Sequence, residues 1–263
     1  MTKMNSSKIT IETIRAMKTR GEKIAALTAY DFPMAKLLDE AGIPLLLVGD
    51  SLGMVVLGYP DTTLVTQAEM EHHVRAAARA KPNALLGADL PYKCYETVGD
   101  AVSNSKLLVA AGAEFVKAEG GRKILPQVRA IVSAGIPFFG HLGMLPQSVL
   151  EEGGYHVKGK TETEQEALLA DAKALADAGA FAIVLELVMS PVAGEITRQV
   201  SIPTIGIGSG PDCDGQILVT PDLIGTFPWF TPRFVKPQAN CAAEIKSTVA
   251  GWKNSLQPPN PGK

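Results

Sequence analysis

The chain has 263 residues, of which 46% are hydrophobic and 20% are charged, and its formal net charge at pH 7 is -2. This composition is typical of a globular protein with enough apolar side chains for a large core. The balanced charge, without a long basic run, predicts no nucleic-acid partner and no membrane partner. In addition, no segment has the roughly 18 consecutive apolar residues of a membrane-spanning helix.

The cysteines and the chain ends favour a cytoplasmic protein. Cys94, Cys213 and Cys241 form neither a metal-spaced pair nor an even set of disulfide partners, so we expect reduced thiols. The N-terminal MTKMNSSKIT lacks the apolar stretch of a secretory signal. Residues 1–7 and about 255–263 are expected to be disordered tails, the second because it is rich in Pro, Asn and Gly.

Along the chain, a leading helix at 9–20 is followed by short apolar runs that alternate with helical segments. The runs are almost continuously apolar, which is typical of parallel strands covered on both faces. Strands are predicted at 24–30, 45–50, 84–90, 115–120, 137–143, 181–187, 204–210 and 216–220. Helices are predicted at 32–41, 66–80, 97–111, 123–134, 161–180, 189–199 and 241–253. Thr163 with Glu166 predicts a capping box at the start of the helix within 161–180.

This alternation predicts one fold for the whole chain. Strand and helix repeat about eight times without a break in composition, which indicates a single (β/α)8 TIM barrel domain over residues 1–263. The leading helix is expected to cover the bottom of the barrel. A doubly wound open sheet is the alternative. The last two strands are the weakest part of the barrel prediction, because only the short turn PDCDG separates them.

Several predicted strands end in ionisable side chains. In a parallel barrel the carboxyl ends of all strands meet at one face, and that face carries the active site. Residues that are far apart in sequence are therefore expected to converge there. The strand-end residues are Asp50, Asp89, Lys117 with Glu119, His141 and Glu186.

Three of these residues predict a metal site. Asp50, Asp89 and Glu119 follow the second, third and fourth strands, which are neighbours in a barrel. Three carboxylates in one place repel each other unless a cation lies between them. Oxygen ligands that are completed by water or substrate oxygens favour Mg2+. The alternative is that each acid caps a helix or pairs with a nearby basic side chain.

The other strand-end residues have candidate roles in binding and proton transfer. Lys117 shares a strand face with Glu119, where it could hold a substrate carboxylate or simply pair with that acid. Ser51 offers a hydroxyl and a backbone N–H at a helix-starting turn suited to an anion. Glu186 has apolar neighbours, so burial should raise its pKa towards the range of a general base. His141 could donate to a substrate oxygen or be a structural donor.

Other polar residues give weaker signals. The turn GIGSG at 206–210 resembles a phosphate-binding loop, although so short a pattern is not specific. His72 and His73 are predicted to be solvated surface residues. His156, in GGYHVKGK, could flank the site, and Tyr30 at the end of the first strand could line the same mouth.

The sequence closely resembles the ketopantoate hydroxymethyltransferase family. The resemblance runs from about residue 8 to about residue 225 and rests on motifs in the family's order: TAYD, LLLVGDSLGMVVLG, ADLPY, GAEFVKAEGG, GHLGMLPQSV, GGYHVKGK, VLELV and GIGSGPDCDGQILV. Together these motifs are far more specific than any one alone. The resemblance implies a (β/α)8 barrel that assembles as a homodecamer and catalyses the first committed step towards pantothenate and coenzyme A.

The resemblance also implies a reaction and a set of site residues. A hydroxymethyl group passes from 5,10-methylenetetrahydrofolate to 3-methyl-2-oxobutanoate, by Mg2+-assisted enolate formation, to give 2-dehydropantoate. Glu186 is then the proton acceptor. The implied ligands of one Mg2+ per subunit are Asp50, Asp89 and Glu119. The implied substrate contacts are Asp50, Ser51, Asp89, Lys117 and His141.

A rival hypothesis keeps the barrel and the metal but changes the chemistry. Lyases and mutases of the isocitrate lyase and phosphoenolpyruvate mutase type also bind an α-ketoacid-like group on Mg2+ at barrel strand ends. They usually carry a reactive loop such as KKCGH, and this sequence has none. A sugar-phosphate isomerase would leave the three acids without a role. A barrel that only binds a ligand would be expected to lack a metal ligand or the base. The α-ketoacid lyase or mutase is therefore the alternative that remains.

Overall fold

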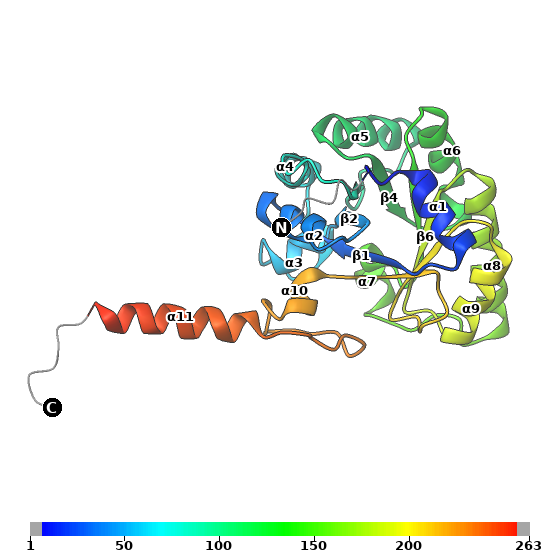
Figure 1. Ribbon diagram of the computed structural model, residues 1–263. Coiled ribbons are helices and arrows are strands. Elements are labelled where there is room, and N and C mark those ends of the chain that lie inside the picture. The colour runs from blue at the N-terminus through cyan, green and yellow to red at the C-terminus, as the bar shows by residue number, and fades with distance from the viewer. Residues whose placement is uncertain (1–6, 257–263) are drawn as a thin grey trace, which may run out of the picture. The chain divides into compact units, whose positions relative to one another are not determined.

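The computed structural model describes residues 7–256 and contains a closed barrel of parallel strands (Figure 1). The strands follow one another around the barrel in sequence order, which confirms the predicted (β/α)8 barrel. The open-sheet alternative is wrong because the last strand completes a closed sheet. The strands are β1 (Ile24–Thr28), β2 (Leu45–Val48), β3 (Leu85–Asp89), β4 (Phe115–Glu119), β5 (Phe138–Gly143), β6 (Ala182–Glu186), β7 (Thr204–Ile207) and β8 (Gly215–Leu218).

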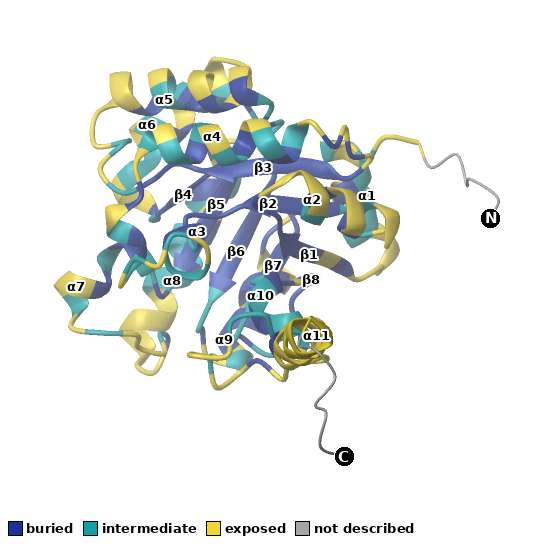
Figure 2. Cartoon of the chain, turned by 90° about the vertical axis from the view of Figure 1, so that its left-hand side faces the viewer, coloured by how far each residue is buried: buried dark blue, intermediate teal, exposed yellow. Residues whose placement is uncertain are grey.

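Helix α1 (Ile11–Arg20) precedes β1, and the other helices of the barrel follow individual strands. They are α2 (Phe32–Glu40), α3 (Leu52–Val55), α4 (Gln67–Ala78), α5 (Val98–Ala111), α6 (Leu125–Ser133), α7 (Val149–Glu152), α8 (Glu162–Asp177) and α9 (Ser190–Gln199). The 3-10 helices within residues 7–256 are η1 (Thr62–Leu64), η2 (Arg122–Ile124) and η3 (Pro146–Ser148). Figure 2 shows buried strands inside helices whose outer faces are exposed. Between β7 and β8 the described chain has no helix, so the alternation is incomplete at the predicted PDCDG turn.

The start of α8 differs from the predicted capping box. Thr161 is the N-cap residue, and its side chain accepts a hydrogen bond from the backbone N of Glu164. The carboxylate of Glu164 accepts from the backbone N of Lys160 at 2.8 Å. The prediction of Thr163 with Glu166 is therefore wrong, because the helix begins two residues earlier and both residues lie inside it.

The chain divides into two compact units, Met1–Ile217 and Leu218–Lys263. The second unit holds α10 (Thr220–Ile224) and α11 (Cys241–Ser255). The prediction of one domain over residues 1–263 stays a prediction. Residues 1–6 and 257–263 of the predicted tails lie outside the described residues, and Ser255, near the predicted start of the second tail, is the last residue of α11.

Two further sequence expectations concern the whole described chain. None of the helices within residues 7–256 combines the length and the apolar character needed to cross a membrane. Cys94, Cys213 and Cys241 are free thiols in the structure.

The floor of the barrel is a tightly packed apolar cluster. The rings of Phe115 and Phe181 have centroids 5.1 Å apart, and Phe139 packs against both of them. A Cβ atom on Gly87 would lie 2.1 Å from the Phe115 ring, so only glycine fits beside it. Ile14 of α1 is fully buried in the same cluster, so α1 covers the bottom of the barrel as predicted.

The polar residues lie above this floor because side chains of a strand alternate between its two faces. On β4, Lys117 and Glu119 therefore share the inward face with Phe115. Strand pairing then sets their neighbours: Asp89 of β3 lies beside Lys117, and Glu119 lies beside His141 of β5. The period of the strands and the register of the sheet thus bring polar side chains from adjacent strands to one height in the barrel mouth.

Candidate active site at the mouth of the barrel

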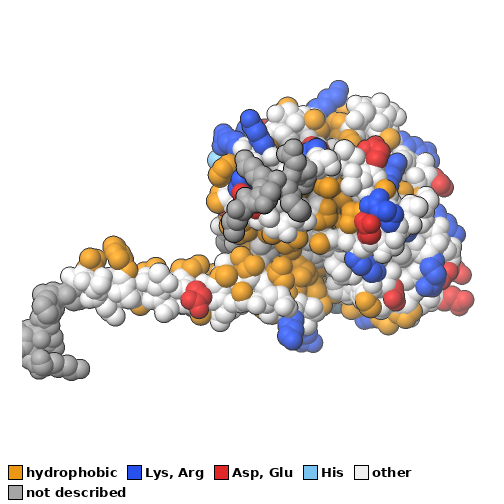
Figure 3. Space-filling model, in the orientation of Figure 1, with side chains coloured by type: hydrophobic (Ala, Val, Ile, Leu, Met, Phe, Trp, Pro, Cys, Tyr) orange, Lys and Arg blue, Asp and Glu red, His pale blue; other side chains and the backbone are white. Residues whose placement is uncertain are grey.

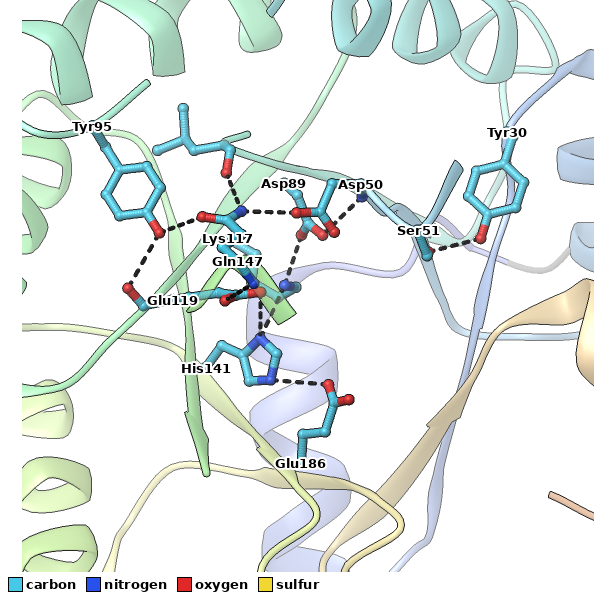
Figure 4. A network of polar contacts seen from close by, with 11 residues as sticks. Tyr30, Asp50, Ser51, Asp89, Tyr95, Lys117, Glu119, His141, Gln147 and Glu186 are labelled. Carbon is cyan, nitrogen blue, oxygen red and sulfur yellow. Dashed lines mark hydrogen bonds and ion pairs between the residues drawn. The ribbon is translucent and has the colours of Figure 1, made fainter. Parts of the chain in front are cut away.

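The predicted strand-end residues lie together at the carboxyl ends of the strands, where Figure 4 shows them pointing towards one another. Of these, Asp50, Asp89, Lys117, Glu119 and His141 are each at most 5% exposed. Among the residues drawn, four carboxyl groups, including that of Glu186, face a single ammonium group. The interior of the mouth therefore carries more negative than positive charge when all the acids are ionised.

Asp50 and Asp89 are in direct contact at the ends of β2 and β3. The backbone N of Asp50 donates to Oδ2 of Asp89 at 3.1 Å. Burial, together with the neighbouring Asp89 carboxylate, raises the pKa of Asp50 to about 7. A cation placed beside Asp50 would therefore stabilise the ionised form of this carboxyl group.

Lys117 is the cation of the site. Its Nζ lies 3.0 Å from Oδ1 of Asp89, so the ammonium pairs with the neighbouring strand and not with Glu119 two residues along its own strand. Burial by itself disfavours the charged form. The carboxylates of Asp89, Glu119 and Asp50 outweigh burial and raise the pKa of Lys117 above its usual range. The side chain is thus a fixed positive charge in the mouth.

His141 lies between Lys117 and Glu186. Its Nδ1 accepts a hydrogen bond from the Lys117 ammonium at 3.3 Å, because a charged lysine can only donate. Burial and the Lys117 charge hold the pKa of His141 well below its usual range, so the imidazole is neutral. Its one proton is therefore on Nε2, which lies 3.2 Å from Oε2 of Glu186.

Glu186 is the least enclosed acid of the group. Its side chain is 14% exposed, whereas that of His141 is 3% exposed. Burial raises the pKa of Glu186 to about 7, as expected from its apolar neighbours in sequence. One carboxylate oxygen faces His141 and the other points away from the imidazole (Figure 4). A carboxyl group with these properties is suited to removing a proton near neutral pH.

Sequence reasoning missed two residues of this network, Gln147 and Tyr95. The backbone N of Gln147, in η3, donates to Oε2 of Glu119 at 2.9 Å, and its side-chain amide reaches Asp50 at 2.8 Å. The Tyr95 hydroxyl, from the loop after β3, donates to Oε1 of Gln147 at 2.6 Å. A signal for Gln147 existed, since PQS follows GHLG closely, whereas nothing in the sequence around Tyr95 marks it as special.

Ser51 and Tyr30 form a separate polar contact at the rim. Their hydroxyl oxygens lie 2.9 Å apart. Ser51 is the N-cap residue of α3 but makes no side-chain bond to that helix, which has four residues. His73 was predicted to be a solvated surface residue, and this is wrong. Its Nδ1 is bonded to the backbone oxygen of Tyr30 at 2.7 Å, whereas His72 is exposed.

The weaker candidates do not belong to the central cluster of strand-end residues. Ser209 of the GIGSG turn is buried, and its hydroxyl donates to the Leu185 oxygen at 2.7 Å and accepts from Val188 N at 2.9 Å. That hydroxyl therefore ties two loops together. His156 is exposed. In the same loop, burial and the Glu186 carboxylate raise the pKa of Tyr155 to about 12, so this loop lies within electrostatic reach of the site.

The residues present meet the chemical requirements of a hard cation. Within residues 7–256 no group of three or more His, Cys, Asp or Glu side chains is arranged to hold a metal ion by itself. Nevertheless, Oε1 of Glu119 is buried and makes no hydrogen bond with the described residues. Burial and the Asp50 charge raise the pKa of Glu119 well above its usual range. An oxygen-only donor set with unneutralised charge fits Mg2+ completed by other oxygen ligands.

Comparison with known sequences gives one consistent family. The family described as ketopantoate hydroxymethyltransferase matches the chain over residues 8–259. A 3-methyl-2-oxobutanoate hydroxymethyltransferase of Moorella thermoacetica is 52% identical over 253 residues, which is 95% of this chain and 94% of the relative. A protein of the same name from Ignicoccus hospitalis is 53% identical over 251 residues, or 95% of each chain.

Comparison with solved structures supports the fold. A phosphoenolpyruvate phosphomutase from Streptomyces platensis has a TM-score of 0.63 at 14% identity, and the match covers 94% of this chain and 87% of the other. An oxaloacetate acetylhydrolase has a TM-score of 0.66 at 15% identity, with coverage of 96% and 92%. At such low identity these structures share the barrel architecture with the chain, and the similarity carries no information about its reaction.

Proposed function

The chain belongs to the ketopantoate hydroxymethyltransferase family, and from this premise we propose how its barrel mouth carries out the reaction. The enzyme is a one-carbon transferase that hydroxymethylates 3-methyl-2-oxobutanoate, the first committed step of pantothenate biosynthesis. The α-ketoacid lyase or mutase alternative rests on the shared fold alone, whereas the family match covers nearly the whole chain.

Asp50, Asp89 and Glu119 are the residues that would hold one Mg2+ per subunit. Three features support this assignment: the three side chains offer only oxygen ligands, Glu119 has a buried oxygen without a hydrogen bond to the described residues, and the acids outnumber the lysine. When bound, the cation would act as a Lewis acid towards the keto group of the substrate. Water and substrate oxygens would fill the remaining positions.

Lys117, His141 and Ser51 orient the substrate. The Lys117 ammonium is a permanent positive charge, so it attracts the α-ketoacid carboxylate and stabilises negative charge on the enolate oxygen. His141 is neutral, and its Nε2 lies 3.2 Å from Oε2 of Glu186 but makes no hydrogen bond with the described residues, so it can donate to a substrate oxygen. The Ser51 hydroxyl, paired with Tyr30, offers a further hydrogen bond at the rim.

Glu186 removes the proton from C3 of the substrate, and its position is the observation that carries this proposal. The acid ends β6 across the mouth from the three acids, its pKa lies at about 7, and it keeps contact with solvent. The electron pair of the C3–H bond forms the enolate, whose C3 attacks the methylene carbon of 5,10-methylenetetrahydrofolate. As C3 bonds to the methylene carbon, one C–N bond of that carbon breaks. Water replaces the second nitrogen and supplies the hydroxyl group of 2-dehydropantoate; the C3 proton and one water proton end on the two nitrogens of the departing tetrahydrofolate.

We also propose that the enzyme is a cytoplasmic homo-oligomer, a decamer by family resemblance. The cysteines are free. Helix α11 carries exposed apolar residues at spacings of four, three and four, a pattern that packs helices against one another; Figure 3 shows hydrophobic side chains along this helix. These residues are Ile245, Val249, Trp252 and Leu256.

The test is a reconstitution of the reaction with purified protein. After treatment with a chelator, 2-dehydropantoate should form only when 3-methyl-2-oxobutanoate, 5,10-methylenetetrahydrofolate and Mg2+ are all present. Full activity after exhaustive chelation would overturn the metal assignment. Activity with another one-carbon donor but not with the folate would overturn the donor assignment while leaving the transferase assignment intact.

A further inference from the structure

Gln147 connects three acid-bearing strand ends although it belongs to none of them. It lies in η3, directly after β5, and is 4% exposed. Its Nε2 donates to Oδ2 of Asp50 at 2.8 Å and to the backbone oxygen of Leu90 at 3.0 Å. Its backbone N donates to Oε2 of Glu119 at 2.9 Å. A single residue thus holds the ends of β2, β3 and β4 at fixed separations.

Tyr95 sets the orientation of the Gln147 amide. Its hydroxyl donates to Oε1 of Gln147 at 2.6 Å and lies 3.3 Å from the backbone oxygen of Glu119, to which it can also donate. A flipped amide would direct its oxygen at the Asp50 carboxylate and the Leu90 carbonyl, both of which are acceptors. In the observed orientation both Nε2 protons and Oε1 have partners, so the amide is locked.

The hydrogen bonds of Gln147 determine which carboxylate oxygens remain available to a cation. Gln147 engages one oxygen of Asp50 through its side chain and one oxygen of Glu119 through its backbone. The other oxygen of Glu119, Oε1, makes no hydrogen bond with the described residues. We propose that Gln147, oriented by Tyr95, is a positioning residue that holds Asp50 and Glu119 so that Oε1 of Glu119 and the Asp50 oxygen not bonded to Gln147 are directed at the divalent cation. This inference rests on the proposed function, in which these acids bind Mg2+.

The experiment compares matched methionine substitutions. Gln147→Met keeps the length of the side chain and removes both donors and the acceptor. Gln127→Met is the control, because Gln127 donates to the backbone oxygens of Tyr95 and Glu96 and so supports the same loop without touching a site carboxylate. The affinity for Mn2+ is measured by electron paramagnetic resonance without substrate. The Mg2+ concentration that gives half-maximal activity is measured separately.

Gln147→Met should weaken Mn2+ binding and raise the half-maximal Mg2+ concentration by about 10–100-fold, the usual loss when a partner of a metal ligand is removed. Saturating Mg2+ should restore most of kcat, and Gln127→Met should leave the Mn2+ affinity unchanged. Tyr95→Phe, which removes only the hydroxyl that orients the amide, should give a smaller loss in the same direction.

The outcomes separate this inference from the function on which it rests. If the wild-type protein itself binds no divalent cation, the metal assignment of the proposed function fails. If the wild type binds Mn2+ and folded Gln147→Met binds it equally well, the positioning role is refuted and the metal assignment stands. If Gln147→Met does not fold, Tyr95→Phe decides, and an unchanged Mn2+ affinity in that variant refutes the proposal.

Discussion

The proton acceptor can be tested by following one bond, the C3–H bond of 3-methyl-2-oxobutanoate. In D2O, the enzyme with Mg2+ should exchange this proton, and proton NMR reports its loss. Replacing Glu186 by Gln keeps the shape of the side chain and removes the base. General bases contribute about 10²–10⁴-fold to such steps, so we expect exchange in Glu186→Gln to fall by that factor.

The pH dependence gives a second, independent measure. Burial raises the pKa of Glu186 from 4.5 to about 7, so the basic form is lost as pH falls through 7. About one-tenth of the sites are ionised at pH 6 and about half at pH 7. Exchange in the wild type should therefore drop about tenfold from its plateau at pH 6. A Glu with the ordinary pKa would remain almost fully active there.

Two results would refute this reasoning. Exchange that stays constant between pH 5 and pH 8 would show that no group with a pKa near 7 controls the step. Wild-type exchange in folded Glu186→Gln would show that another group removes the proton. His141→Gln is the companion variant, because it removes the imidazole that faces Glu186 at 3.2 Å and keeps the base itself.

Three further predictions concern metal binding and stability. Glu119→Gln should weaken Mn2+ binding at least about tenfold with an unchanged circular dichroism spectrum; full Mg2+-dependent activity in this variant would contradict the three-carboxylate site. The pKa of Asp50 is 3.8 ordinarily and about 7 in the folded protein. Between these two pH values the folded state therefore holds a proton that the unfolded state has lost. The free energy of unfolding of cation-free protein should therefore fall as pH rises across this window, and urea titrations should show a shallower fall in Asp50→Asn. Gly87→Ala places a Cβ 2.1 Å from the Phe115 ring and should lower the free energy of unfolding by about 1–3 kcal/mol; an unchanged urea midpoint would contradict the packing argument.

The sequence predicted the barrel well because its strands are short, apolar and regularly spaced. It also predicted which residues meet at the mouth, since strand period and strand order decide that placement for Lys117, Glu119 and His141. Local details were less predictable. Thr163 and Thr161 both begin a T-x-x-E pattern, and only the path of the preceding loop decides that Thr161 caps the helix.

Residues that act through loops were beyond the reach of these patterns. Gln147 and Tyr95 follow β5 and β3 and lie in segments without a period. Their meeting at 2.6 Å depends on two loops folding against each other. His73 was misjudged for the same reason, because its partner is a backbone oxygen of the first strand-end loop. Periodicity predicts where side chains of helices and strands point. The residues that support the site make their contacts through loops, which have no such period.

The proposed cation binding would be coupled to folding through the acids themselves. Asp50 and Glu119 have raised pKa values because folding buries them beside like charges. Burying these carboxylates in their ionised form therefore costs the folded state free energy, and this penalty grows with pH. The apolar packing of the barrel offsets it. A divalent cation at the acids removes part of this penalty and binds only the folded state, so it must raise stability. Because the penalty is larger at pH 8 than at pH 5, Mg2+ should raise the melting temperature more at pH 8. Equal shifts at both pH values would mean that the cation binds away from these acids.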